Sequence, residues 1–413
     1  MRQSIIFILY LLCTFTARSQ SALTPEQTGS IYYAYPVPSS TYTPAPTGYE
    51  PFYISHYGRH GSRWMTADER YTEVICVFDS LYQCSELTPL GVDVRERLHK
   101  VWEDARGCSG SITPLGERQH REIAERMYRN FPQVFRGGAF IDARSSTSLR
   151  CAMSMSYFTE RLKELNPGLQ VNRRAYHRYM DYIAYTSPEG EKFASEKAPW
   201  RRGFREFEKK NVRPERLMAS LFVKPEAITD QDAMMRSLYW IAADMQNVEL
   251  DLSFYDIFEY EELVGVWKTV NARMYVCNAA APLNGGLMPR CAVPLLRNIL
   301  ESADAAIEKG TPAADLRFGH DTHLIRLLAL MQIEGCSNQE VDMEKFHLAW
   351  QDYRVSPMGA NLQLIFYRDK KNDILVKFLL NECEVTLPLK SKMVPYYSWK
   401  EVETFLAEII GKE

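Results

Sequence analysis

Hydrophobic and polar positions along the chain follow two patterns, one typical of short buried strands and one typical of amphipathic helices. Short apolar runs occur at 52–55, early in 138–146 (GAFIDARSS) and early in 315–331 (DLRFGHDTHLIRLLALM), and each leads into a polar turn. Helical stripes lie between them, as in 112–131, where Ile123, Met127 and Phe131 share one face. Strands that alternate with helices in this way predict an α/β fold.

Between about residues 172 and 275 the pattern changes. This stretch is rich in Lys, Arg and Glu, carries long helical patterns and has few strand candidates. The α/β pattern then returns, and 361–380 alternates on both sides of a Lys-Asn-Asp turn, as a β-hairpin does. We therefore predict a Rossmann-like α/β sandwich domain formed by 20–171 and 276–413, with an inserted, mostly helical cap domain at 172–275. A lead-in at 24–51, rich in Pro, Ser and Thr, has little helix potential.

The N-terminus has the layout of a secretory signal peptide. Arg2 precedes an apolar run from Ile5 to Phe15, and the small residues Ala17 and Ser19 follow as a cleavage signal. We predict a signal peptide at 1–19 and export to the periplasm or the medium. A lipid anchor at Cys13 is the alternative, although the bulky Leu12 precedes it. No later segment has the apolar length of a membrane span.

Composition and charge narrow the functional classes. The 413 residues are 46% hydrophobic and 24% charged, which is typical of a globular protein, and the net charge of −3 gives no general attraction to nucleic acid. Without Cys13, eight cysteines remain, an even number that permits disulfides in an oxidising compartment. Cys277 and Cys291 flank a turn-rich loop and are the best candidate pair. No CxxC or HExxH motif supports a metal site, and no cofactor is indicated.

Three predicted strand ends carry unusual polar groups. The first is the run Arg59-His60-Gly61-Ser62-Arg63, the second begins at Arg144, and the third contains His320 and Asp321. Ligands of open α/β sheets bind outside the carboxyl ends of the strands. If the three strands are neighbours, three arginines, two histidines and one carboxylate converge at one place.

Such a group suits a phosphate ester. Guanidinium groups match phosphate oxygens in bidentate geometry and stay charged, so Arg59, Arg63 and Arg144 can hold a phosphate dianion. A neutral imidazole is a competent nucleophile toward phosphorus. A carboxylic acid beside a bound phosphate keeps its proton more readily and can protonate the leaving alkoxide.

With these motifs the chain resembles the histidine acid phosphatases, a branch of the histidine phosphatase superfamily. The signature Arg-His-Gly-x-Arg matches residues 59–63, and the Thr-x-x-Gly-x-x-Gln stretch matches Thr113, Gly116 and Gln119. A mid-chain arginine, in an Arg-Ser-Ser/Thr-x-Arg-like context, matches Arg144, and Gly-His-Asp-Thr matches 319–322. The resemblance covers roughly residues 50–385, including the helical insertion.

The resemblance implies phosphomonoester hydrolysis through a phosphohistidine on His60, without a metal. The phosphate would be bound by Arg59, Arg63, Arg144 and His320, and Asp321 would donate the proton. The partner would be a small-molecule phosphomonoester, with phytate or other inositol polyphosphates among the candidates. Related multiple inositol polyphosphate phosphatases usually carry His-Ala-Glu in place of His-Asp, so the chain looks closer to the acid phosphatase and phytase group. Trp64-Met65 departs from the family's usual loop and bears on substrate preference.

Three alternative readings stay open. Cys291 and Arg297 have the spacing of a cysteine phosphatase loop, but the interior AVPLL lacks glycine, and we favour a helix start with a buried or bridged cysteine. A catalytically inactive phosphate-ester-binding protein could have lost His60 or Asp321, yet both are present. A phosphotransferase or mutase of the same superfamily is disfavoured by the signal peptide and the helical insertion.

A basic stretch lies within the predicted insertion, at 201–216, with seven Lys or Arg against three Glu. Facing the pocket, it would favour polyphosphorylated substrates. A solvated helix with charged neighbours is the interpretation we favour, and the sequence does not say which face these residues occupy.

Overall fold

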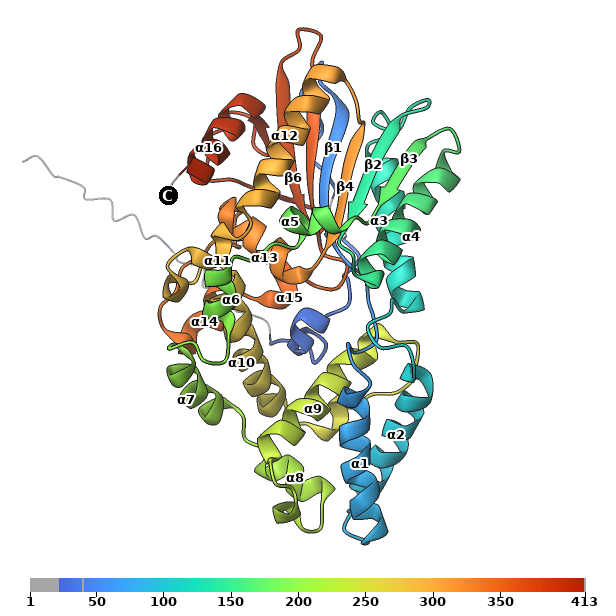
Figure 1. Cartoon of the computed structure of the whole chain (residues 1–413), viewed down its shortest axis with the longest axis vertical. Coiled ribbons are helices and arrows are strands. Elements are labelled where there is room, and N and C mark those ends of the chain that lie inside the picture. The colour runs from blue at the N-terminus through green and yellow to red at the C-terminus, as the bar shows by residue number, and fades with distance from the viewer. Residues whose placement is uncertain (1–21, 39–40, 412–413) are drawn as a thin grey trace, which may run out of the picture.

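The computed structural model describes residues 22–38 and 41–411. The predicted signal peptide lies outside the described residues. In Figure 1 the molecule is elongated, with a sheet and its covering helices at the top and a bundle of helices at the bottom. The α/β fold class is confirmed. None of the helices in the described part is both long and apolar enough to cross a membrane.

One mixed sheet forms the upper part, with the strand order β3-β2-β4-β1-β5-β6-β7 and β8 paired to β6. The strands β1, β2, β3 and β4 are parallel to one another, whereas β5 to β8 join in antiparallel fashion, beginning with the predicted hairpin of β5 and β6. The central β4 is buried along its whole length because helices cover both faces. The strand bounds are β1 Glu50–Arg59, β2 Phe140–Ser145, β3 Gln170–Arg174, β4 Ala314–Gly319, β5 Asn361–Arg368, β6 Ile374–Leu380, β7 Cys383–Val385 and β8 Tyr396–Ser398.

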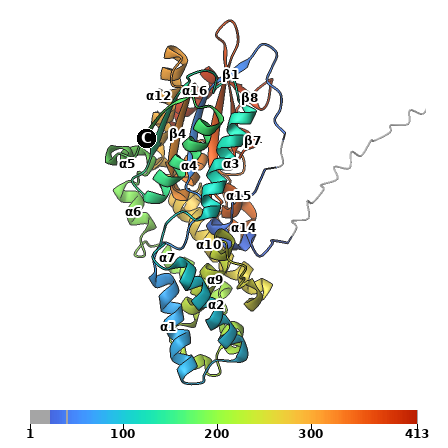
Figure 2. The ribbon, with the colours of Figure 1, turned by 90° about the vertical axis from the view of Figure 1, so that its right-hand side faces the viewer.

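Two layers of helices enclose the sheet. One face is covered by α3 and α4 (Figure 2), which pack on it through aliphatic and aromatic side chains. The other face packs on α5, α12, α13 and α16. Helix α3 begins where Thr113 accepts a hydrogen bond from the Gly116 N–H, with Pro114 in its first turn, as the sequence predicts. The bounds are α3 Pro114–Asn130, α4 Leu149–Leu165, α5 Met180–Ile183, α12 Val293–Lys309, α13 Asp321–Leu330 and α16 Trp399–Gly411.

The lower, helical part has its own hydrophobic core. The sequence analysis assigned residues 69–105 to the α/β domain, but α1 and α2 share this core with the helices of the insertion, since their apolar faces meet those of α8, α9 and α10. The main helices of this part are α1 Glu69–Gln83, α2 Pro89–Ala105, α8 Glu215–Leu221, α9 Gln231–Asp244 and α10 Tyr260–Asn278. Between the two parts lie α6 Pro188–Ala194, α7 Arg201–Asn211, α11 Leu287–Arg290, α14 Phe346–Ala349 and α15 Asp352–Val355.

Short 3₁₀ turns complete the chain, and the first of them differs most from the sequence-based expectation. The lead-in forms η1, which packs between α9, α10 and α15 near the centre of the molecule, close to the carboxyl end of β1. Its Thr28 and Ser30 side chains are fully buried. The turns are η1 Gln27–Tyr32, η2 His177–Tyr179, η3 Pro225–Ala227, η4 Met245–Asn247, η5 Tyr255–Ile257, η6 Pro282–Asn284 and η7 Met343–Lys345.

Candidate active site

The three predicted strand ends meet at one edge of the sheet. Strand β4 lies between β1 and β2, and all three run in the same direction, with Arg59 paired to Gly319 and Ser145 paired to Phe318. Strand β1 continues to Arg59 instead of stopping near residue 55, because it stays hydrogen-bonded to both neighbours. His60 and His320 therefore follow adjacent strands, and their ring centroids are 5.8 Å apart.

His60 is held as a neutral ring with one nitrogen left over for chemistry. Its Nδ1 lies 2.9 Å from the Gly61 carbonyl oxygen, which accepts hydrogen bonds and cannot donate them, so Nδ1 carries the proton. Nε2 then holds the lone pair. Burial, together with the charges of Arg59, Arg63 and Arg150, brings the pKa of His60 well below its usual value. The lowered pKa favours the neutral imidazole, which is the form that a nucleophile needs.

Arg59 and Asp321 form the second unit of the site. Arg59 is fully buried, its Nη1 donates to the carbonyls of Ile31 and Ser356 at 2.7 Å each, and its Nη2 lies 3.3 Å from Oδ2 of Asp321. Burial raises the pKa of Asp321, but the charges of Arg59 and His320 outweigh it, and the net pKa is below the usual value. The carboxyl is consequently ionised in the ligand-free protein.

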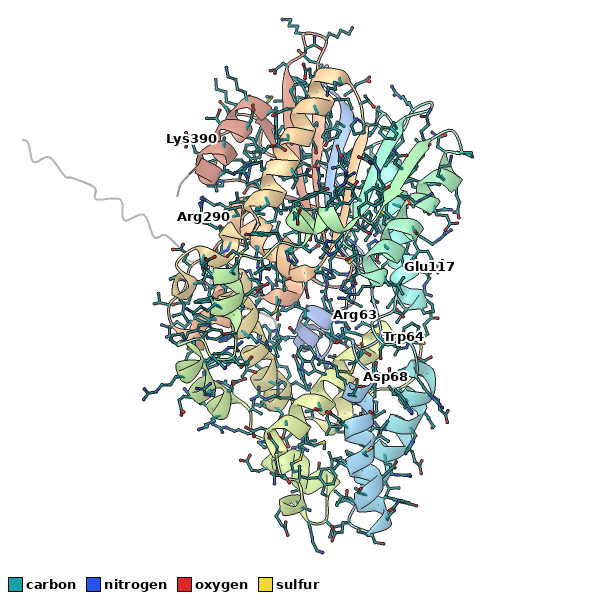
Figure 3. All side chains as sticks on the ribbon, viewed as in Figure 1. Arg63, Trp64, Asp68, Glu117, Arg290 and Lys390 are labelled. Atoms are coloured by element: carbon teal, nitrogen blue, oxygen red, sulfur yellow. The ribbon has the colours of Figure 1, made fainter. Side chains whose placement is uncertain are left out.

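Arg63 lies between the sheet and the helical part (Figure 3). Its Nη1 donates to the Tyr32 hydroxyl at 3.1 Å and to the Trp64 carbonyl at 3.0 Å, and its guanidinium carbon lies 4.7 Å from the centroid of the Tyr32 ring. Tyr32 comes from η1, in the lead-in for which the sequence predicted only little helix potential. The lead-in therefore helps to position two of the arginines of the site.

The structure does not bring Arg144 to this group. Its guanidinium forms ion pairs with Asp142 and Asp315, and burial is outweighed by these two charges, so its pKa is raised. Asp142 and Arg144 project from the same face of β2, and Asp142 is paired in register with Asp315 of β4, so two carboxylates hold Arg144 back along the sheet. The prediction for this residue is corrected on geometric grounds.

Arg150, in the first turn of α4, lies near His60, where the sequence analysis had expected Arg144. Its charge lowers the pKa values of His60 and His320 and acts on Asp321. The sequence analysis missed it, although the second arginine of the Arg-Ser-Ser context stands six residues after Arg144. The charges of three guanidinium groups, those of Arg59, Arg63 and Arg150, thus act on His60.

His320 directly follows β4, and its ring lies beside that of His60. Burial and the charge of Arg150 lower its pKa to about 4. Its Nε2 is 3.3 Å from the Ser146 hydroxyl, and the hydroxyl of Tyr57 accepts its backbone N–H at 3.3 Å. These contacts hold His320 at the carboxyl end of β4, next to His60.

The Thr-x-x-Gly-x-x-Gln stretch supports the catalytic loop. A side chain at Gly61 would meet the Gly116 carbonyl oxygen at 2.6 Å, so the loop and α3 approach closely only with glycine at this position. Gln119 accepts the Ser62 N–H and donates to the Ser62 hydroxyl, both at 2.9 Å. The Ser62 hydroxyl in turn donates to Asn247, which joins the loop to the helical part.

The structure also bears on the basic stretch at 201–216 and on the predicted disulfide between Cys277 and Cys291. Within the basic stretch, Arg201 pairs with Glu196, Lys210 with Glu344 and Arg216 with Glu262, as expected of a helix with charged neighbours. The disulfide prediction fails in this structure, because Cys277 and Cys291 are free thiols. Cys291 lies just before α12, with its Sγ against the Ser187 hydroxyl and the Leu287 carbonyl, which agrees with a buried cysteine at a helix start.

The comparisons with known proteins agree with this geometry. The model of the histidine phosphatase superfamily, branch 2, matches residues 59–381. Comparison with curated protein sequences gives no match. The fold is similar to that of a multiple inositol polyphosphate phosphatase from Bifidobacterium longum, solved with phosphate, with a TM-score of 0.80, 19% identity and coverage of 92% of this chain and 97% of that one.

Two phytases have the same fold. The phytase from D. castellii has a TM-score of 0.71 and 15% identity, with coverage of 98% of this chain and 90% of that one. The phytase from Hafnia alvei, solved with tartrate, has a TM-score of 0.57 and 12% identity, with coverage of 89% and 99%. With the family model matching most of the chain and the catalytic motifs gathered at one sheet edge, the protein belongs to branch 2 of the histidine phosphatase superfamily.

Proposed function

We propose that the protein is an exported phosphomonoesterase that hydrolyses its substrate through a phosphohistidine on His60, with Asp321 as the proton donor. One observation carries the proposal: a neutral imidazole is surrounded by buried guanidinium groups whose N–H donors are not all used. Within the described residues, Nε of Arg59, Arg63 and Arg150 and Nη2 of Arg59 have no hydrogen-bond partner. Buried donors of this kind favour a multiply charged, oxygen-rich anion such as a phosphate group.

The first chemical step transfers the phosphoryl group to the protein. Nε2 of His60 attacks phosphorus as the bond to the ester oxygen breaks, and Arg59, Arg63, Arg150 and His320 neutralise the equatorial oxygens. Asp321 gives its proton to the leaving alkoxide and becomes a carboxylate. In the second step, Asp321 takes a proton from water, the hydroxyl attacks phosphorus, and the bond to Nε2 breaks. Inorganic phosphate leaves, and both residues return to their starting states.

Asp321 acquires its proton as the substrate binds. Arg59 favours the carboxylate in the ligand-free protein. A phosphate dianion bound to the same guanidinium offsets that charge and places negative charge beside the carboxyl, and both effects raise its pKa. Ground-state binding therefore prepares the acid.

For the substrate we propose inositol polyphosphates, among them phytate. Support comes from the similar structures, whose names are multiple inositol polyphosphate phosphatase and phytase. The ion pairs of the basic stretch argue against that stretch as a free cationic surface. Specificity for several phosphates then has to come from residues nearer His60.

The test is a phosphate-release screen of the mature protein with phytate, sugar phosphates and an aryl phosphate, from acid to neutral pH. We expect release that is absent in a His60→Ala variant, faster in acid, and unchanged by a chelator because arginines supply the positive charge. Absence of release from every ester by a folded protein would overturn the proposal, and restoration of chelated enzyme by a divalent ion would overturn the metal-free mechanism.

A further inference from the structure

Asp244 is a buried carboxyl group of the helical part, and it lies close to the loop that carries Arg63. Asp244, the last residue of α9, has no exposed surface. Its Oδ2 accepts the Tyr71 hydroxyl at 2.7 Å, and that hydroxyl accepts the backbone N–H of Met65 at 2.9 Å. The chain of contacts runs from α9 through α1 to the residue two positions after Arg63. Asp244 is thereby fixed against the catalytic loop.

Asp244 and Arg63 each keep a buried polar atom without a partner in the part of the chain that the structure describes. Within the described residues, Oδ1 of Asp244 and Nε of Arg63 are buried without hydrogen-bond partners. Asp244 lies close enough for its charge to raise the pKa of Arg63, and the charge of Arg63 lowers that of Asp244. A buried carboxyl with a single cationic neighbour is sensitive to anything that changes that cation.

We propose that Asp244 binds a proton when an anion binds to Arg63, so that a residue outside the catalytic group sets how tightly the site holds phosphate. The inference rests on the proposed function, because it assumes that Arg63 binds the phosphate. An anion on Arg63 offsets the charge that stabilises the Asp244 carboxylate, which then gains a proton. By linkage, protonated Asp244 must favour anion binding by the same factor.

The groups around Asp244 place this event near neutral pH. Burial raises the pKa of Asp244 to about 7, against the lowering effects of the Tyr71 hydrogen bond, Arg63 and the Met65 backbone, and Asp104 of α2 raises it further. From the other elements, the charge of Asp244 acts on Tyr255 of η5, and Tyr32 of η1 faces Tyr71. Burial raises the pKa of Tyr255, so this phenol stays neutral in this range.

In the ligand-free protein, the groups of the proposed catalytic site have pKa values away from neutrality. In the ligand-free protein the pKa of His320 is about 4, those of His60 and Asp321 lie below their usual values, and that of Arg59 is about 10. Because a bound anion also raises the pKa of Asp321, a change of anion affinity near neutrality is attributable to Asp244 where Asp244→Asn abolishes it. The sign follows: the anion binds tightly below the pKa of Asp244 and more weakly above it.

The experiment measures binding of sulfate to the intact mature protein by calorimetry. Sulfate stays a dianion across the range, so its own titration does not interfere. We expect Kd to rise about tenfold between about pH 5.5 and about pH 8.5, as for two charges interacting across a partly buried gap. Near neutrality, titrations in two buffers of different ionisation enthalpy should show proton uptake with sulfate.

Three variants separate a charge effect from a structural one. Asp244→Asn keeps an acceptor for Tyr71 and removes the titration, so sulfate should bind tightly throughout and without proton uptake near pH 7. Tyr71→Phe removes a hydrogen bond that favours the carboxylate, so the midpoint should move to higher pH. Asp104→Asn removes an exposed carboxylate near the same place and should keep a step, with its midpoint moved slightly to lower pH because Asp104 raises the pKa of Asp244.

The outcomes distinguish the two proposals. Sulfate that binds with an affinity independent of pH above 6, or with the same step in Asp244→Asn, overturns the role of Asp244 and leaves the phosphatase proposal standing. Sulfate that fails to bind at any pH contradicts the anion site itself. A Tyr71→Phe midpoint that stays in place would also count against Asp244 as the titrating group.

Discussion

The two histidines of the candidate site, His60 and His320, and a second pair of buried histidines, His56 and His120, differ in what surrounds them. His56 lies four residues before His60 on β1, and His120 of α3 is close to it; burial lowers the pKa of each to about 3. Their rings pack against Phe158 and Phe318, with centroids 5.2 to 6.4 Å apart. The pKa values of His60 and His320 are also lowered, but these two histidines lie among guanidinium groups.

The comparison shows that a depressed histidine pKa is not by itself a sign of function. Burial lowers the pKa values of both pairs. His56 and His120 pack against phenylalanine rings instead of guanidinium groups that could hold a substrate anion. Around His60 and His320, the same neutral state is combined with guanidinium N–H donors that have no hydrogen-bond partner within the described residues. The carboxyl group of Asp321 lies 3.3 Å from Arg59. The arginines therefore define the site, and the histidines use the field that the arginines create.

The largest expected difference between the pairs is in turnover. His60→Ala removes the nucleophile and should lower kcat on the order of 10⁵-fold, as in other enzymes with covalent catalysis. His56→Phe keeps an aromatic ring in the inner cluster and should keep turnover near the wild-type value. Steady-state kinetics on folded variants checks both. Equal losses in the two variants would break the distinction.

Asp321→Asn tests the next largest effect. General acid catalysis contributes roughly 10²–10⁴-fold, so the variant should lose about that factor with an alkyl phosphate and much less with p-nitrophenyl phosphate, whose phenolate leaves without a proton. Because Asp321 must be protonated and His60 is already neutral, the wild-type rate on alkyl esters should fall as pH rises. Equal losses on the two substrates would mean that Asp321 positions the phosphate or His60 instead.

The two arginines of the RSSTSLR stretch give a third contrast. Arg150→Ala removes positive charge next to His60 and should cost about 10²–10³-fold in kcat/KM. Arg144→Ala leaves Asp142 and Asp315 without their common partner and should lower the free energy of unfolding by about 3 kcal/mol. Kinetics and denaturant unfolding, measured on both variants, decide the assignment. A reversed outcome would restore Arg144 as the phosphate ligand.

The last expected effect is confined to acid pH and concerns the stability contributed by His56 and His120. The folded pKa values of His56 and His120, about 3, lie below the value of 6.5 for a free histidine. The unfolded chain therefore binds more protons in acid, and stability is lost as pH falls below about 6.5, by about 1.4 kcal/mol per histidine per pH unit. Relative to wild type, His56→Phe should unfold less readily in acid. Identical acid profiles would show that His56 is protonated in the folded protein.

These contrasts also show which parts of the molecule could be predicted from the sequence. Short apolar runs followed by polar turns identified β1, β2 and β4, and motif order placed His60, His320 and Asp321 together. Arg144 could not be excluded, because one of the two carboxylates that hold it, Asp315, lies 171 residues further along the chain, on another strand. Competition between two arginines is decided by such tertiary neighbours.

Two other features left no recognisable pattern. The carbonyl of Ile31 that accepts the Arg59 hydrogen bond is a backbone atom, and any residue type would supply it, so the role of η1 has no sequence signature. The amphipathic faces of α1 and α2 predict that these helices pack, but not which core they join. In the structure they join the helical part.

The most direct test of the account is to look for phosphate on His60. Enzyme mixed with labelled substrate should be quenched within one turnover without acid, digested at alkaline pH and analysed by mass spectrometry, with Asp321→Asn included because slower alkoxide departure changes the amount of intermediate. The account predicts label on the peptide that contains His60, none on those that contain His56 or His120, and none in His60→Ala. Label on another residue, or turnover by His60→Ala at the wild-type rate, would contradict it.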